Sequence, residues 1–167
     1  MYIKFPGIYK ILERKNTCER IDPGSIDVQK MKVRYIIIFY SMKILELFAG
    51  SRSLWKIAEK HWNDVFSVDW TDYEWINLVK DISSLSLSDI PWIPDMIWAS
   101  PDCTSYSVAG ISHHRNWTEA KSEYAKQCDW TNQHFLSLIK RIVEINPDCV
   151  FFIENPRGML RKMPWMQ

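Results

Sequence analysis

The sequence lacks the features that mark several common classes of protein. Its 167 residues include four cysteines, and these show neither the CxxC pairs nor the Cys/His spacing of zinc sites and disulfide frameworks. No apolar run approaches the ~18 residues of a membrane-spanning helix, and no signal-peptide pattern is present. The net charge is +1, so no overall field attracts the chain to a polyanion. These absences predict a cytoplasmic protein without a metal site or a membrane segment.

Glycine is also scarce, with five residues, and no G-x-G-x-x-G fingerprint occurs. The composition itself is globular, because 47% of the residues are hydrophobic and 25% are charged. Residues 1–41 carry no chemical constellation, whereas a regular strand pattern begins at Met42. We therefore predict an N-terminal extension of unclear role over residues 1–41, or an over-assigned start, and a functional domain over residues 42–167.

From Met42 onward, strand-sized apolar runs alternate with helical patterns. The strand-sized runs are residues 44–48, 65–69, 96–99 and 149–153, with a short further element near residues 81–82. Helical patterns extend to about residue 61, with Leu54, Ile57 and Ala58 on one face, and from about residue 119 to 145. Residues 104–118 are expected to form an irregular loop. This alternation predicts an α/β fold with a mostly parallel sheet and helices on both faces.

A cysteine follows the third long strand pattern, in the stretch Ser100-Pro101-Asp102-Cys103. In open α/β sheets, ligands bind outside the carboxyl ends of the strands, although a lone cysteine there is more often a buried core thiol. Glu154 ends the next long strand, so we expect its carboxyl to face the same cleft. A carboxylic acid beside a nucleophilic thiol suits attack on an electron-poor ring whose nitrogen gains a proton. Asn155 is expected to hold the cysteine loop by side-chain hydrogen bonds.

A glycine-bearing turn, Phe48-Ala49-Gly50, follows the first strand and would let a ligand approach the backbone. Asp69 ends the second strand 19 residues after Gly50, where an acid holds a ribose diol in nucleoside-binding folds. Because the full glycine fingerprint is missing, we favour a single adenosine-containing cofactor over a dinucleotide. An ordinary turn followed by a surface aspartate is the alternative.

Taken together and in this order, the motifs resemble those of the DNA cytosine-5 methyltransferases, particularly the small phage-type members. Phe48-Ala49-Gly50 is similar to the first S-adenosylmethionine motif, Pro101-Asp102-Cys103 to the nucleophile motif, and Glu154-Asn155-Pro156 to the glutamate–asparagine motif. The resemblance covers residues 42–167. It implies a Rossmann-like, S-adenosylmethionine-dependent methyltransferase fold, double-stranded DNA as partner, and a bacterial or phage-infected cell, with restriction–modification as the setting.

The resemblance also implies a mechanism and a set of site residues. A cytosine flipped out of DNA would be methylated at C5 through a covalent adduct with Cys103, while Glu154 supports protonation at N3. The implied catalytic residues are Cys103, Glu154 and Asn155. The implied S-adenosylmethionine-binding residues are Leu47, Phe48, Ala49, Gly50, Ser51, Ser53, Asp69, Trp70, Asp81, Ile82, Ser100 and Pro101. Among them, Asp69 would hold the ribose and Trp70 would pack on the adenine. Asp81 and Ile82 would lie at the edge of the adenine. The implied DNA-binding residues are Ser105, Ser107, Arg157 and Arg161.

The sequence also departs from the family pattern. Asp102 stands where the family usually has proline, Thr104 where it has glutamine, and Ser51 and Ser53 where it has glycines. The family's later arginine-bearing motif, target-recognition region and final strand and helix have no counterpart here, so we expect the C-terminal part of the fold to be missing. A truncated or split-gene fragment that binds cofactor and needs a complementing C-terminal chain is therefore one alternative.

An amino-methyltransferase acting on adenine N6 or cytosine N4 is the other alternative. Such enzymes carry a Pro-Pro-aromatic motif at the same strand end, and the Ser100–Cys103 stretch lacks its aromatic residue.

Overall fold

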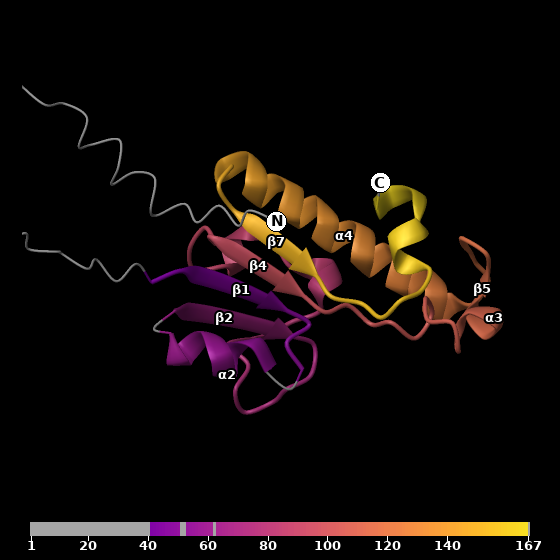
Figure 1. Ribbon diagram of the computed structural model, residues 1–167, viewed down its shortest axis with the longest axis horizontal. Coiled ribbons are helices and arrows are strands. Elements are labelled where there is room, and N and C mark those ends of the chain that lie inside the picture. The colour runs from indigo at the N-terminus through magenta and orange to yellow at the C-terminus, as the bar shows by residue number, and fades with distance from the viewer. Residues whose placement is uncertain (1–40, 51–52, 62, 167) are drawn as a thin grey trace, which may run out of the picture. The chain divides into compact units, whose positions relative to one another are not determined.

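The computed structural model describes residues 41–50, 53–61 and 63–166, which belong to one compact unit, Ser41–Gln167 (Figure 1). The predictions for residues 1–40 and for Ser51 lie outside the described residues, as does the side chain of Ser53. Within the described part of the chain, no helix combines the length and apolar character needed to cross a bilayer.

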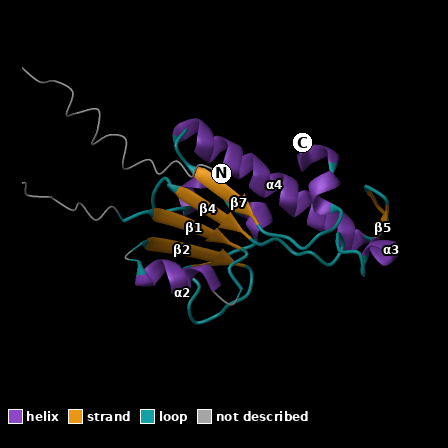
Figure 2. Cartoon of the chain, in the orientation of Figure 1, coloured by secondary structure: helices purple, strands orange, loops and turns teal. Residues whose placement is uncertain are grey.

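Five strands form one sheet in the order β3-β2-β1-β4-β7 (Figure 2). Their bounds are β1 Lys43–Leu47, β2 Asp64–Asp69, β3 Leu78–Val79, β4 Met96–Ala99 and β7 Val150–Ile153. All four pairings are parallel. The four long runs are therefore confirmed as strands, with bounds shifted by at most one residue, and the short element near residue 81 is β3 followed by a 3₁₀ turn.

The helices are α2 Ser53–Lys60, α3 Ile111–His114 and α4 Glu123–Ile145, and the 3₁₀ turns are η2 Ile82–Ser84, η3 Leu87–Asp89, η4 Leu160–Lys162 and η5 Pro164–Met166. A small antiparallel hairpin, β5 Arg115–Asn116 with β6 Glu119–Ala120, precedes α4. The prediction that α4 begins near residue 119 is wrong, because that residue belongs to the hairpin. The helix begins at Glu123, where the Ser122 hydroxyl caps it by accepting a hydrogen bond from the Ala125 amide at 3.1 Å. The expected irregular loop thus contains a short helix and a hairpin.

The main core lies between the sheet and α4. Leu45 and Leu47 of β1 belong to one buried cluster with Phe135 and Ile139 of α4. The alternate residue of β1, Glu46, lines a cleft with Leu54 and Ile57 of α2, so α2 covers the opposite face of the sheet. Helices on both faces are as predicted. Of the three residues predicted on one face of this helix, Leu54 and Ile57 both line the cleft, Ile57 with 60% of its surface exposed, and Ala58 is buried.

Candidate active site at the carboxyl ends of the strands

The predicted motifs meet where the sheet reverses its direction of growth. From β1 the chain moves outward to β2 and β3, then returns to β4 on the other side of β1, and such a switch point opens a crevice at the carboxyl ends of the strands. Backbone hydrogen bonds continue the pairing past the strand ends: Ser100 N–H donates to the Leu47 carbonyl at 3.2 Å, and Glu154 N–H donates to the Ala99 carbonyl at 2.8 Å. The glycine turn, the cysteine loop and the glutamate turn therefore leave the sheet side by side.

The glycine turn is tightly braced. Phe48 has φ 57° and Gly50 has φ 47°, both in the left-handed region, which is costly for a residue other than glycine. The Gly50 amide donates to Asp69 Oδ2 at 3.0 Å, and the Trp75 indole N–H donates to the Gly50 carbonyl at 3.1 Å. A strained aromatic residue is thus held at the centre of the crevice.

Asp69 serves this turn directly. Its side chain is buried, and its two oxygens accept hydrogen bonds from the amides of Gly50 and Thr71, the latter at 2.8 Å. Asp69 is not among the residues that line the two clefts described below. Its observed role is to shape the turn, and a ribose contact stays a prediction.

The first cleft, of about 440 Å³, lies on the α2 side of the crevice. It is lined by Glu46, Phe48, Ala49, Gly50, Leu54, Ile57, Trp98, Ser100 and Glu154. Two of these residues are acidic, and none of the described lining residues is Lys, Arg or His. Sequence reasoning overlooked the buried Glu46, although an acid inside an otherwise apolar strand was an available signal.

The second cleft, of about 400 Å³, shares Phe48 with the first and extends to α4. It is lined by Phe48, Trp70, Asp81, Ile82, Asp102, Tyr124, Gln127, Cys128, Thr131 and Asn132. Its lining includes Trp70, Asp81 and Ile82, the three residues predicted to surround an adenine. Trp70 is 77% exposed. The α4 residues were overlooked, because the helical pattern of the sequence identifies only the apolar face of that helix.

The remaining predicted cofactor residues are placed differently. Phe48, Ala49, Gly50 and Ser100 line the first cleft, and their contact with a cofactor stays a prediction. The side chain of Leu47 is wholly buried in the core, and Pro101 is also buried, so neither lines a cleft. Both contribute backbone carbonyls to the structure of the crevice, since the Leu47 carbonyl accepts from the Ser100 amide and the Pro101 carbonyl accepts from the Asn155 side chain.

The cysteine loop passes between the two clefts, since Ser100 lines one and Asp102 the other. Cys103 itself is half-buried, and its carbonyl accepts hydrogen bonds from the amides of Tyr106 at 3.0 Å and Ser107 at 2.8 Å, closing a tight turn. The expectation that Asn155 holds this loop is confirmed, because its side-chain amide donates to the Pro101 carbonyl at 2.9 Å. The buried side-chain oxygen of Asn155 has no hydrogen-bond partner among the described residues.

Asp102 carries a negative charge next to Cys103. Burial opposes its ionisation, but hydrogen bonds from the Tyr124 hydroxyl and the Thr104 amide outweigh this effect and lower the pKa of the carboxyl. Burial together with the same contact raises the pKa of the Tyr124 hydroxyl. The hydrogen bond between Tyr124 and Asp102 links α4 to the cysteine loop.

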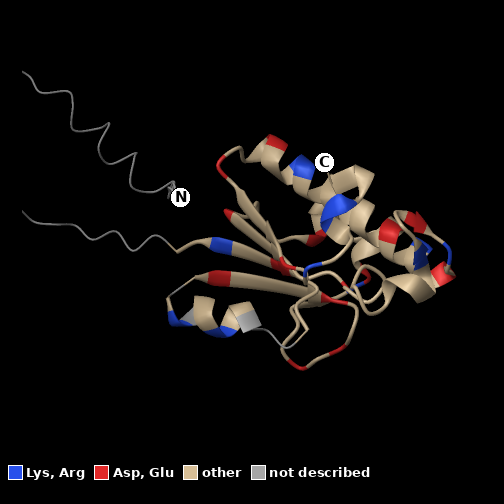
Figure 3. Cartoon of the chain, turned by 45° about the vertical axis from the view of Figure 1, so that its right-hand side comes forward, with Lys and Arg blue, Asp and Glu red and all other residues tan. Residues whose placement is uncertain are grey.

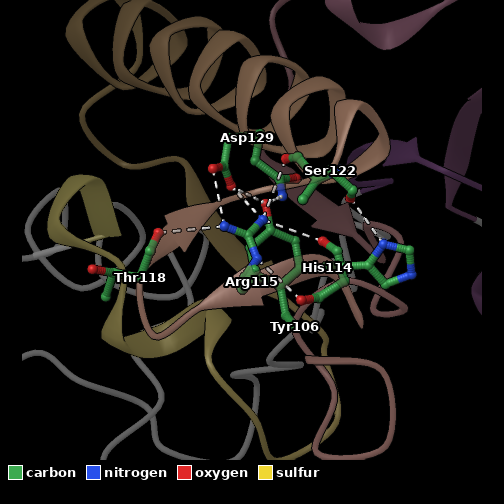
Figure 4. A network of polar contacts seen from close by, with 9 residues as sticks. Tyr106, His114, Arg115, Thr118, Ser122 and Asp129 are labelled. Carbon is green, nitrogen blue, oxygen red and sulfur yellow. Dashed lines mark hydrogen bonds and ion pairs between the residues drawn. The ribbon is translucent and has the colours of Figure 1, made fainter. Parts of the chain in front are cut away.

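Below the cysteine loop lies a buried polar network centred on Arg115 (Figure 4). Its guanidinium donates to both oxygens of Asp129, at 2.6 and 3.0 Å, and lies 4.1 Å above the ring of Tyr106. It also donates to the Ser105 hydroxyl at 3.2 Å and to the Ser105 carbonyl at 3.0 Å. Burial and the Asp129 carboxylate raise the pKa of the Tyr106 hydroxyl.

The network shows that one of the predicted DNA-binding residues, Ser105, has a different position from the one expected. Ser105 is fully buried and its hydroxyl binds Arg115, so it is a support of the loop rather than a surface residue. Ser107 is half-buried and forms an antiparallel bridge with Gly158, which joins the cysteine loop to the segment after Glu154. Arg157 and Arg161 are exposed and available to a partner.

Within the described ranges, no group of three or more His, Cys, Asp or Glu side chains is arranged to hold a metal ion. Fold and site together define a doubly wound α/β protein with two acidic clefts at its switch point. In comparisons with known proteins, the chain matches no protein-family model and no curated protein.

Proposed function

We propose that this protein is a DNA cytosine-5 methyltransferase that uses S-adenosylmethionine and has a Rossmann-like methyltransferase fold. One observation carries the proposal: the loop of Cys103 and the turn of Glu154 leave adjacent strands at the switch point, joined by the hydrogen bond from Asn155 to Pro101. A thiol and a carboxylic acid on adjoining loops beside a ligand-sized crevice fit nucleophilic attack with proton delivery.

The clefts fit the proposed cofactor by size and by charge. Their volumes of about 440 and 400 Å³ lie within the range of small-molecule sites, ~300–1,000 Å³. Acids line both clefts, and among the described residues no Lys, Arg or His does, which disfavours phosphate-bearing nucleotides and favours a ligand with cationic groups, such as a sulfonium and an ammonium. The exposed Trp70 ring and the Ile82 side chain offer apolar surface to an adenine. When bound, S-adenosylmethionine would supply an electrophilic methyl group.

The chain's own residues would activate the cytosine. The Cys103 thiolate would add to C6 of the ring, while protonated Glu154 would donate its proton to N3, so that electron density moves to C5. After C5 has accepted the methyl group, a base would take the C5 proton. The thiolate would then leave C6 while the N3 proton returns to Glu154, which restores the C5–C6 double bond and regenerates both residues. Asn155 would keep the nucleophile loop in place throughout, and Arg157 and Arg161 would bind DNA phosphates.

The test is transfer of tritiated methyl from S-adenosylmethionine to unmodified duplex DNA, followed by identification of the labelled nucleoside. We expect label at cytosine C5, its loss in Cys103→Ala and a strong decrease in Glu154→Gln. Cys149→Ala is the matched control, because this thiol is buried and belongs to neither motif. Label on an exocyclic nitrogen, or full activity of Cys103→Ser, would refute the C5 mechanism and support an amino-methyltransferase.

Calorimetric titration with S-adenosylmethionine separates the cofactor site from catalysis. We expect Trp70→Ala to weaken cofactor binding about tenfold, a loss of stacking of about 1.4 kcal/mol. Cofactor binding without methyl transfer would refute catalysis by this chain alone and support the requirement for a complementing chain.

A further inference from the structure

Trp117 lies at the tip of the β5–β6 hairpin, where its exposed side chain and its backbone conformation are both unusual for a tryptophan. Its side chain is 69% exposed, and its backbone has φ 57°. Among the described residues only Phe48, in the proposed active site, shares this left-handed conformation without being glycine. Glycine or asparagine adopts this conformation at lower cost, so a large aromatic residue here gives up stability without gaining core packing. Strain of this kind is typical of functional positions.

The hairpin is a rigid support for this indole. Arg115, in its first strand, is wholly buried and paired with Asp129 of α4, and it also reaches the Thr118 carbonyl at 3.5 Å (Figure 4). Trp117 lies between Arg115 and Thr118 on the turn of this hairpin. A fixed backbone with an exposed ring loses little conformational freedom when the ring binds a partner.

Positive charge adjoins the indole. The Lys162 ammonium of η4 lies 5.3 Å from the centre of the Trp117 ring. Residues 155–166 contain Arg157, Arg161 and Lys162, all exposed, and no acid (Figure 3). The two clefts, in contrast, are lined by acids. Glu119 is the acid on the hairpin itself. An aromatic face beside a run of cations is suited to a nucleic-acid strand, with bases for stacking and phosphates for ion pairing.

We propose that Trp117, Arg161 and Lys162 form a DNA-contact surface in which the indole stacks on a base that has lost its neighbour and the two cations bind the adjoining phosphates. The proposal rests on the proposed function for the identity of the partner, because extrusion of a target cytosine leaves the flanking bases without a stacking partner. An exposed, rigidly held ring replaces the lost stacking.

The experiment measures binding of the full chain to a fluorescently labelled duplex with one abasic position, by anisotropy at several salt concentrations. We expect Trp117→Gly and Trp117→Ala to weaken binding about tenfold or more, and Trp117→Phe to retain most of the affinity. Trp117→Gly relieves the positive φ, so its melting temperature should equal or exceed that of the wild type and a folding defect cannot explain the loss. Lys162→Gln should lower the slope of log K against log salt by about one. Trp130→Ala, which removes an indole of α4 that is 64% exposed, is the matched control and should bind normally.

Unchanged affinity of Trp117→Gly, or an equal loss in Trp130→Ala, would overturn the proposal, as would tighter binding to an RNA of the same length. Methyl transfer and cofactor titration keep the two proposals distinguishable. If Cys103→Ala abolishes methyl transfer while Trp117→Gly binds DNA normally, the proposed function stands and this surface is refuted. If binding depends on Trp117 but no methyl is transferred, the surface stands and catalysis by this chain is refuted.

Discussion

Replacing Arg115 with methionine tests how strongly the buried ion pair ties the cysteine loop to α4. The Arg115 side chain is 0% exposed and that of Asp129 is 17% exposed. The guanidinium satisfies the Asp129 carboxylate and the Ser105 carbonyl and hydroxyl, and it covers the Tyr106 ring. Methionine fills much of the same volume but donates no hydrogen bond, so the substitution removes the polar partners while limiting the cavity.

The expected loss in the free energy of unfolding depends on the polar groups that Arg115→Met leaves without a partner, above all the Asp129 carboxylate. Removing one partner of a buried ion pair typically costs about 3–5 kcal/mol, because the other charge remains unpaired. The partial exposure of Asp129 lets water reach its carboxylate, so we expect the lower end, about 3 kcal/mol in the free energy of unfolding. For a unit of this size, that loss lowers the melting temperature by about 10 °C.

Urea unfolding followed by circular dichroism measures this loss, with Asp129→Asn and the double variant completing a thermodynamic cycle. We expect the double variant to be more stable than the sum of the single losses predicts, by more than about 1 kcal/mol. Lys126→Met is the control, because the Lys126–Glu123 pair is exposed and should contribute less than about 0.5 kcal/mol. A loss below about 1 kcal/mol for Arg115→Met, or strict additivity, would refute the reasoning.

Three further substitutions test other parts of the structure. Gly158→Ala places a Cβ 2.4 Å from the Tyr106 carbonyl oxygen, so we expect a loss of about 1–3 kcal/mol in urea unfolding; an unchanged midpoint would contradict the close approach. Phe135→Ala removes a fully buried ring and should cost about 3–5 kcal/mol, and a loss below about 1 kcal/mol would show that the core does not depend on it. The hydrogen bond from Lys80 lowers the pKa of Asp89 from 3.8 to about 2, so its contribution is present above pH ~4 and is lost as the pH falls towards 2. Asp89→Asn should therefore flatten stability against pH in that interval, and an identical acid slope in wild type and variant would disprove the link.

Much of the fold could be predicted because its signals are local. The long strands are apolar runs whose period and length depend on neighbouring residues alone, and each ends at a polar or glycine-bearing motif. Parallel strands place their carboxyl ends on one edge, so the motifs of Gly50, Cys103 and Glu154 could be expected together from the order of the strands along the chain. The hold of Asn155 on the cysteine loop followed from the same placement.

The sequence could not predict the contacts that support the site, because they join residues far apart in the chain. Residues 104–118 have no periodicity, so Ser105 has the character of a surface serine in the sequence, and Asp129 that of a solvated helix residue, although Arg115 binds both. The same holds for the α4 side of the second cleft, which is made of polar residues that a helical pattern assigns to solvent. It also holds for Asp69, whose carboxylate is occupied by the Gly50 amide.

The sequence by itself therefore determined the α/β class, the strands and the motifs at their ends, since hydrophobic periodicity and turn chemistry act within a few residues. Only the tertiary structure decided the strand order, the position of the switch point, the burial of Ser105 and the approach of Lys162 to Trp117. The physical reason is that these depend on which distant segments pack together, and that choice is made by the closure of the core as a whole.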